Sequence, residues 1–234
     1  PRPPKAPRGR PLLGLALGSG VARGWAHIGV LQELDAQGLS PDIVCGSSIG
    51  AVVGGAYAAG KLAEMEEFAR STTVRRMFAM LDFSFGGGLF GGRRLEARLA
   101  QSLGGMTIEA LPRRFAAVAT EVGTGHEIWI SRGDLVTAMR ASYALPGVFE
   151  PVRVEDRWLF DGALVNPVPI TACRALGADM VVAVNLNADS VGRGTVIQDH
   201  VRLESESGRA SEPPRSQRGR ILMGDGASLG MATV

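Results

Sequence analysis

Short apolar runs alternate with helical stretches at the start of the chain, and this alternation restricts the fold more than any other feature. The run LLGLAL at 12–17 precedes a helical stretch from about Gly24 to Gln37, and DIVCG at 42–46 precedes a second one ending near Ala59. Strand, helix, strand and helix in this order predict a parallel sheet with crossover helices. We therefore expect an α/β fold with a mostly parallel central sheet and helices on both faces.

The chain continues the same pattern toward residue 187. Two helices are expected at 61–70 and 93–103, the second with Leu95, Leu99 and Leu103 four residues apart on one face. Further strands are expected at 114–120, 126–131, 157–160 and 179–186, and further helices at 133–142 and 169–176. With 45% hydrophobic residues the chain can bury a core of normal size. Residues 12–187 are predicted to form one domain.

The two ends differ in composition from this region. Residues 1–11 are rich in Pro and Arg and are expected to form a disordered, basic segment, whose charge would also suit anionic lipid. From residue 188 the chain is rich in Arg, Ser, Gly and Glu as far as Arg220, which is typical of a flexible linker. The apolar end at 221–234 is interpreted as a truncated C-terminal segment. Residues 188–234 are thus predicted to lie outside the domain.

Composition excludes several classes of protein. The formal net charge is +2, which is too small to indicate a nucleic-acid-binding surface. The two cysteines, Cys45 and Cys173, lie in apolar runs, which favours free thiols in a reducing compartment over disulfides or metal sites. No signal peptide is recognisable, and no run approaches the ~18 apolar residues that span a bilayer. We expect a cytoplasmic protein without metal or cofactor, with at most peripheral membrane contact.

The strongest local motif is Gly46-Ser47-Ser48-Ile49-Gly50, which has the form G-x-S-x-G. It follows a predicted strand and opens a predicted helix, which is the context that a nucleophilic serine requires. The flanking glycines allow a sharp turn that presents Ser48 beside the positive end of the helix. An isolated match would be interpreted as a turn with a helix-capping serine.

A second glycine-rich turn, GSGVARG at 18–24, follows the first predicted strand. A dinucleotide-binding fingerprint would need a third glycine where Arg23 stands, so that interpretation fails. The alternative is an oxyanion hole whose free backbone N–H groups, above all those of Gly20 and Val21, face the Ser48 turn at the carboxyl edge of the sheet. Arg23 is expected to anchor the turn.

The third element is Asp161, which ends the predicted strand RWLF and is followed by Gly162. An acid at a strand end is expected at the same edge of the sheet as Ser48. Asp-Gly alone is only a turn signal, and the pair at Asp225 and Gly226 is interpreted as such a turn, because no nucleophile motif or strand accompanies it.

Four segments together resemble the patatin-like phospholipase family in its bacterial branch. They are LALGSGVARGWAHIGVL (15–31), CGSSIGA (45–51), RASYALPGVFEPV (140–152) and FDGALVNPVPI (160–170). The resemblance implies a three-layer α/β/α fold, Ser48 as nucleophile and Asp161 as general base and acid. Gly46, Gly50 and Gly162 would support these turns. The implied oxyanion hole comprises Gly18, Ser19, Gly20, Val21, Arg23 and Gly24, although Val21 departs from the family's all-glycine form.

The resemblance implies a lipid acyl hydrolase acting on phospholipid, lysophospholipid or another lipid ester. The apolar loop at 75–92, with several Phe among glycines, suits either a lid over a lipid site or part of the core. A Ser-His-Asp esterase is the alternative, but its histidine should follow the acid, which leaves only His200. His27 is more typical of a packed core residue, and His126 precedes Asp161. A non-catalytic lipid- or protein-binding regulator is the third interpretation.

Overall fold

The computed structural model describes residues 10–71 and 90–188, and all of these belong to one compact unit, Pro1–Gly194. Seven strands within this part form a single sheet. Strands β1 (Leu13–Leu17), β2 (Ile43–Ser47), β3 (Arg114–Glu121) and β7 (Met180–Val184) pair in parallel, with β1 between β2 and β7 and with β3 on the far side of β2.

The other strands join through β3. Strands β4 (Glu127–Ile130) and β6 (Arg157–Asp161) both run antiparallel to β3, and β5 (Val152–Val154) runs antiparallel to β6. Five of the seven strands therefore point the same way, since β5 is parallel to β3 and only β4 and β6 are reversed. The predicted mostly parallel sheet is confirmed.

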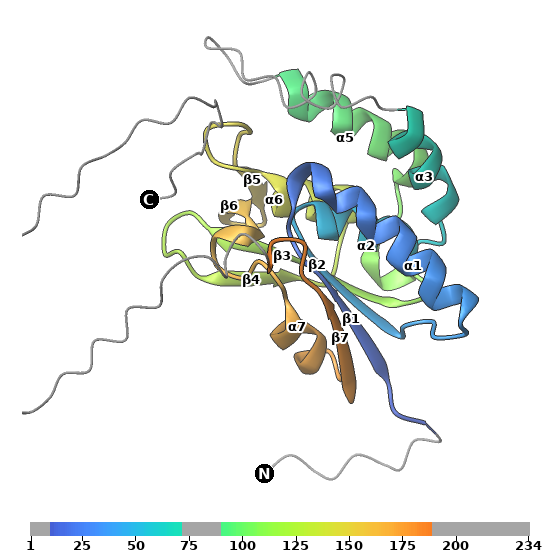
Figure 1. Ribbon diagram of the computed structural model, residues 1–234. Helices are drawn as coiled ribbons and strands as arrows, with labels where there is room; N and C mark the ends of the chain where they lie inside the picture. Colours follow the sequence, from blue (N-terminus) through green and yellow to red (C-terminus); the bar gives the residue numbers. More distant parts are fainter. Residues whose placement is uncertain (1–9, 72–89, 189–234) are drawn as a thin grey trace, which may run out of the picture. The chain divides into compact units, whose positions relative to one another are not determined.

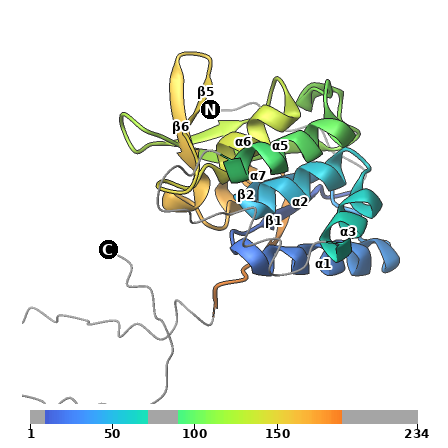
Figure 2. The same ribbon diagram turned by 90° about the horizontal axis from the view of Figure 1, so that it is seen from above.

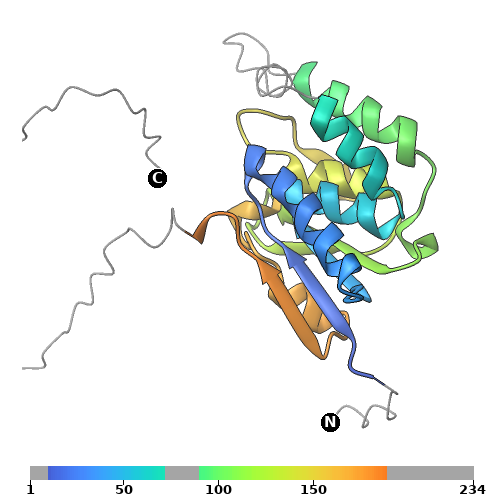
Figure 3. The same ribbon diagram turned by 45° about the vertical axis from the view of Figure 1, so that its right-hand side comes forward.

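Helices cover both faces of this sheet. They are α1 (Ala26–Ala36), α2 (Ile49–Ala58), α3 (Leu62–Ser71), α5 (Phe90–Leu103), α6 (Leu135–Tyr143) and α7 (Ile170–Ala175). Figure 1 shows α1 and α2 on one side of the sheet and α7 on the other, and Figure 3 shows α7 beside β7 and β1. Seen from above, α2 lies between α1 and α6 (Figure 2). Short 3-10 turns at Val21–Trp25, Ile108–Ala110 and Gly162–Leu164 complete the fold.

The core consists of two clusters, one on each face of the sheet. Alternate side chains of β1 point to opposite faces, as they must in a strand: Leu15 and Leu17 join the large cluster with α1, α2 and α6, and Ala16 joins the small one with α7. Cys45 and Cys173 are buried free thiols in the small cluster. This arrangement is the predicted three-layer α/β/α fold.

The predicted helices and strands all occur, with two differences. Helix α5 begins at Phe90, three residues before the expected start, and β5 was not predicted. Leu99 and Leu103 of α5 are buried as expected. The expectations for residues 1–9, for the loop as far as residue 89 and for 189–234 lie outside the described residues. Among the described helices, none combines the length and apolar character needed to cross a membrane.

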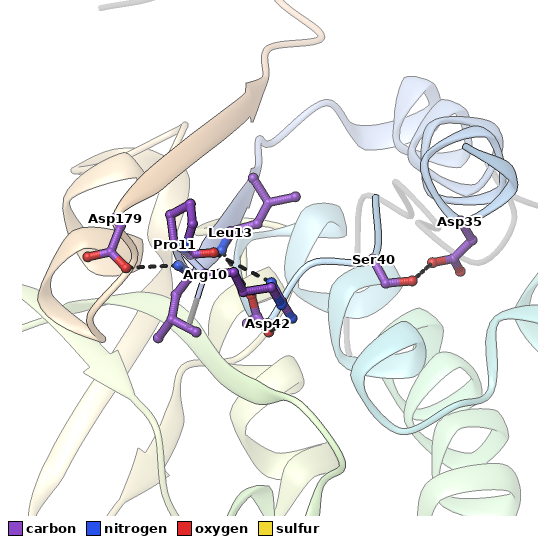
Figure 4. A network of polar contacts seen from close by, with 8 residues as sticks. Arg10, Pro11, Leu13, Asp35, Ser40, Asp42 and Asp179 are labelled. Carbon is purple, nitrogen blue, oxygen red and sulfur yellow. Dashed lines mark hydrogen bonds and ion pairs between the residues drawn. The ribbon is translucent and has the colours of Figure 1, made fainter. Parts of the chain in front are cut away.

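The amino ends of the central strands are joined by carboxylates (Figure 4). Asp42 accepts hydrogen bonds from both terminal nitrogens of the Arg10 guanidinium, at 2.9 and 2.6 Å, and from the Leu13 backbone N–H at 2.9 Å. Asp179 accepts one from the Leu12 N–H at 2.8 Å. These contacts fix the starts of β1, β2 and β7, and the candidate site lies at the opposite, carboxyl ends of β2 and β6.

Candidate active site

Strands β2 and β6 meet end to end along one edge of β3. The last residue of β2, Ser47, pairs with Val118, and the last residue of β6, Asp161, pairs with the next residue, Ala119. Because β6 is antiparallel to β3, it approaches from the opposite direction, and its carboxyl end stops where the carboxyl end of β2 stops. Asp161 therefore lies beside Ser48 at the end of a strand that runs antiparallel to β3.

Ser48 occupies a sharp turn between β2 and α2. Its backbone has φ 57° and ψ −125°, a conformation that a non-glycine residue adopts only when its surroundings impose it. A Cβ atom at Gly46 would lie 2.3 Å from the Gly50 carbonyl oxygen, and one at Gly50 would lie 2.2 Å from the Leu17 carbonyl oxygen. Only glycine fits at these two positions, which explains the motif.

The Ser48 side chain does not cap α2, so the alternative of a capping serine is wrong. Its hydroxyl instead donates a hydrogen bond to Asp161 Oδ2, with an Oγ–Oδ2 distance of 2.6 Å. The other carboxylate oxygen, Oδ1, accepts from the Ala163 N–H at 2.7 Å. Gly162 allows this turn to pack on β3, because a Cβ there would lie 2.1 Å from the Val118 carbonyl oxygen.

Asp161 is only 2% exposed. Burial raises the pKa of its carboxyl group to about 6, against the lowering effect of the hydrogen bonds from Ser48 and Ala163. A carboxylate with this pKa is still mostly ionised at neutral pH and is a stronger base than an ordinary aspartate. Position and basicity both allow Asp161 to accept the Ser48 proton directly.

The glycine-rich turn at 18–24 is held from the side of β7. The Gly18 N–H donates to the Val184 carbonyl at 3.0 Å, and the Ser19 N–H donates to the Pro167 carbonyl at 2.9 Å. Two predicted oxyanion-hole residues therefore have their amides engaged, and the Arg23 N–H is also engaged, by the Gly20 carbonyl. Within the described residues, the Gly20 and Val21 N–H groups donate no hydrogen bond.

This turn packs directly against the Ser48 turn. A Cβ at Gly24 would overlap the Ile49 side chain, at 2.1 Å from its Cγ1, and a Cβ at Gly50 would lie 2.7 Å from the Gly18 carbonyl oxygen. The glycines thus bring the first turn of α2 against the loop that carries the two free N–H groups. Arg23 donates from Nη1 to the Leu186 carbonyl at 3.4 Å, in keeping with an anchoring role.

Val21 adopts φ 48° despite its branched Cβ. This conformation costs a β-branched residue of the order of 1–3 kcal/mol. The side chain is 54% exposed, so about half of its surface is open to solvent in the described structure. The turn therefore forms with valine where the related family pattern has glycine.

The chain matches known proteins in sequence and in fold. The sequence model of the patatin-like phospholipase family matches residues 15–174, which is more than half of the chain. The chain belongs to the patatin-like phospholipase family.

Relatives within and beyond bacteria share this patatin-like region. An uncharacterised NTE family protein of Mycobacterium tuberculosis is 40% identical over 195 residues, which cover 83% of this chain and 54% of the relative, so the chain spans about half the length of this relative. Lysophospholipase nte1 of Emericella nidulans is 29% identical over 75% of this chain and 12% of its own. VipD from Legionella pneumophila shares the fold, with a TM-score of 0.50 at 15% identity over 65% of this chain and 45% of that chain.

Neither of the two histidines within the described part of this patatin-like chain, His27 and His126, forms a hydrogen bond with Ser48 or Asp161. His27 is buried in α1, and its Nε2–H donates to the Gly18 carbonyl at 2.7 Å. Burial lowers the pKa of His27, against the opposite effect of this hydrogen bond, and so favours the neutral ring. His126 is exposed beside β4. His200, the histidine that a triad would need, lies outside the described residues, as does Asp225.

We predict that His27→Ala, His126→Ala and His200→Ala each retain ester turnover within about tenfold of the parent, because a Ser-Asp dyad uses no histidine as base. Initial rates on a short-chain nitrophenyl ester measure this. The parent chain at equal concentration of folded protein is the control. A loss of three or more decades in His200→Ala would instead favour the Ser-His-Asp alternative.

Sequence reasoning missed three residues that brace this site. Pro167 and Asn187 hold the glycine-rich turn: the Pro167 carbonyl accepts from Ser19 N–H, and Asn187 Nδ2 donates to the Ser19 carbonyl at 3.0 Å. Ser142 contacts the Ser48 backbone. The sequence carried a signal for Ser142, which shares the buried face of its helix with Leu135 and Met139. A polar residue on such a face is normally hydrogen-bonded.

Proposed function

We propose that the chain is a lipid acyl hydrolase in which Ser48 is the nucleophile and Asp161 is the general base and acid. The observation that carries this proposal is the 2.6 Å hydrogen bond from the Ser48 hydroxyl, in a strained strand-to-helix turn, to a buried carboxylate. Strain at a single presented side chain is typical of functional sites. Family membership adds that phospholipid-type esters are the class of substrate to test.

In the first half-reaction, Ser48 Oγ attacks the ester carbonyl carbon while Asp161 Oδ2 takes the hydroxyl proton. The tetrahedral intermediate collapses, the bond to the leaving alcohol oxygen breaks, and Asp161 gives that oxygen the proton. In the second half-reaction, water attacks the acyl-serine and its proton passes to Asp161. Collapse releases the fatty acid and returns the proton to Ser48 Oγ, so both residues end as they began.

The developing negative charge on the substrate carbonyl oxygen would be bound by the Gly20 and Val21 N–H groups. These donors already stand without an acceptor in the described structure, so they need not break other hydrogen bonds in the transition state. One such donor is worth typically ~2.7–4 kcal/mol. The amino end of α2, which begins at Ile49 directly after the nucleophile, adds the favourable field of its dipole.

Apolar side chains next to the proposed machinery support a lipid substrate. Val21 follows Gly20 and is 54% exposed, and Leu164 follows the Asp161 turn and is also 54% exposed. Val165 and Leu145 are exposed to lesser degrees. Exposed apolar residues beside a reactive centre suit acyl chains, and they also suit shallow contact with a lipid surface.

Fatty acid release from lysophosphatidylcholine micelles, diacyl phosphatidylcholine vesicles and a soluble nitrophenyl butyrate tests this proposal. We expect acid release from at least one of the two lipids and from the soluble ester. Each acid released should be accompanied by an equal amount of the corresponding alcohol product. A folded chain that sediments with vesicles but releases no fatty acid from any substrate would instead identify a non-catalytic lipid-binding protein. Turnover of the soluble ester alone would reduce the function to a simple carboxylesterase.

A further inference from the structure

The backbone N–H groups of Ser48 and Asp161 both donate hydrogen bonds to one short segment at the end of α6. The Ser142 hydroxyl accepts a hydrogen bond from the Ser48 N–H at 3.0 Å, and two residues later the Ala144 carbonyl accepts one from the Asp161 N–H at 2.9 Å. Residues 142–144 therefore hold the two members of the proposed dyad in a fixed relation, although 113 positions separate them in sequence.

Ser142 makes a second hydrogen bond that fixes its own orientation. Its hydroxyl donates to the Val118 carbonyl at 2.6 Å, and the side chain is fully buried. Val118 is the residue of β3 at which β2 ends, one position before the residue that pairs with Asp161. A serine hydroxyl is one donor and an acceptor, so it satisfies both backbone groups at once.

The Ser48 turn needs such a restraint. A non-glycine residue at φ 57° relaxes toward an ordinary conformation unless its neighbours prevent it. The Ser48 amide nitrogen is bonded to the Cα atom that carries the reactive side chain. Rotation of this peptide group would therefore move Ser48 Oγ away from Asp161 Oδ2. Without the Ser142 hydroxyl, the Ser48 N–H and the Val118 carbonyl would each lose a hydrogen-bond partner in a part-buried site.

We propose that Ser142 is a positioning residue whose hydroxyl fixes the backbone amide of Ser48, so that the strained turn keeps the Ser48 hydroxyl against Asp161. This inference rests on the proposed hydrolase function. It also implies that the Ser48 N–H is not an oxyanion donor, because Ser142 already occupies it.

The neighbouring Ser47 supplies a matched control. It is also a fully buried serine beside the nucleophile, but its Oγ has no hydrogen-bond partner among the described residues. Ser142→Ala and Ser47→Ala therefore remove the same atom at sites of equal burial, and only the first removes hydrogen bonds. Ser142→Thr keeps the hydroxyl and adds a methyl group to a packed site, which lowers stability without removing the restraint.

We expect Ser142→Ala to lower kcat on a soluble ester about 10- to 100-fold with KM changed less than about twofold, since a misplaced nucleophile slows the chemistry more than binding. Ser47→Ala should stay within about twofold of the parent. Ser142→Thr should recover most of the lost kcat while melting at a lower temperature than Ser47→Ala. If Ser142 served only to pack, kcat would instead be lower in Ser142→Thr than in Ser142→Ala.

Hydrogen exchange of the Ser48 amide, followed in peptides that span residues 46–50, gives a readout that needs no turnover. Exchange should be faster in Ser142→Ala than in the parent and in Ser47→Ala, by about tenfold or more. If the parent hydrolyses no ester, the proposed function fails, and the exchange result still decides whether Ser142 restrains this turn. Equal kcat and equal exchange in Ser142→Ala and Ser47→Ala would overturn the inference.

Discussion

Ser48→Ala is expected to abolish ester turnover, by at least about 10⁴-fold, and to abolish covalent labelling by a fluorophosphonate. In the proposed mechanism, this hydroxyl is the protein group that forms the covalent bond to the substrate. Its recorded partner in the described structure is Asp161, and the side chain caps no helix, so its removal leaves the fold in place. Turnover of nitrophenyl butyrate and intact-mass analysis after labelling measure the two effects.

Ser47→Ala is the control for this experiment, since it removes a neighbouring hydroxyl that has no hydrogen-bond partner in the part of the chain that the structure describes. It should label at the rate of the parent chain. Melting temperatures of the two variants within a few degrees of the parent would show that the fold is kept. Labelling that persists in Ser48→Ala would assign the nucleophile to another residue and rule out the proposed mechanism.

Asp161→Asn is expected to have opposite effects on activity and stability. The amide cannot accept the Ser48 proton, so turnover should fall by about 10³-fold or more. The free energy of unfolding at pH 8 should rise by about 3 kcal/mol, because the variant no longer buries an ionised carboxylate whose pKa burial has raised to about 6. A site that is costly for stability and needed for activity is common in enzymes.

The pH dependence of stability distinguishes this effect from a general change in packing. Burial raises the pKa of Asp161 in the folded chain above its ordinary value, so the folded chain binds the proton more tightly than the unfolded chain. The protonated Asp161 carboxyl therefore stabilises the folded chain fully below the pKa that Asp161 has in the unfolded chain. This stabilisation is lost as pH rises through about 6. Urea unfolding should show a gap between Asp161→Asn and the parent that is largest at pH 8 and narrows below pH 6. A gap that is the same at every pH would contradict this explanation.

Local patterns in the sequence predict most of the fold because the strands and helices of this chain are short and strongly patterned. The run at 12–17 and the motif around Ser48 identify a strand, a turn and a helix from neighbouring residues alone. The direction of β6 could not be predicted in this way, because it depends on β3 extending beyond the end of β2. Strand β5 has only three residues, too few for a visible alternation.

The site was predictable to the extent that chemistry requires particular residues. Ser48 and Asp161 stand in motifs that present a side chain, and the structure places them in contact. The carbonyl groups of Val184 and Pro167 decide which amides of the glycine-rich turn remain free. Both residues are far from the turn in sequence, so no local sequence pattern could predict these hydrogen bonds. The role of Ser142 likewise depends on contacts with β3 and α2.

The pH dependence of fluorophosphonate labelling at Ser48 tests most directly whether Asp161 acts on Ser48 as a base without a histidine. We predict a single ionisation with a midpoint of about 6, with the rate rising about tenfold per pH unit below it and level above it. The same curve is predicted for His27→Ala, His126→Ala and His200→Ala. A labelling rate that is flat from pH 4 to pH 8, or a midpoint that disappears when one histidine is replaced, would contradict a Ser48–Asp161 dyad.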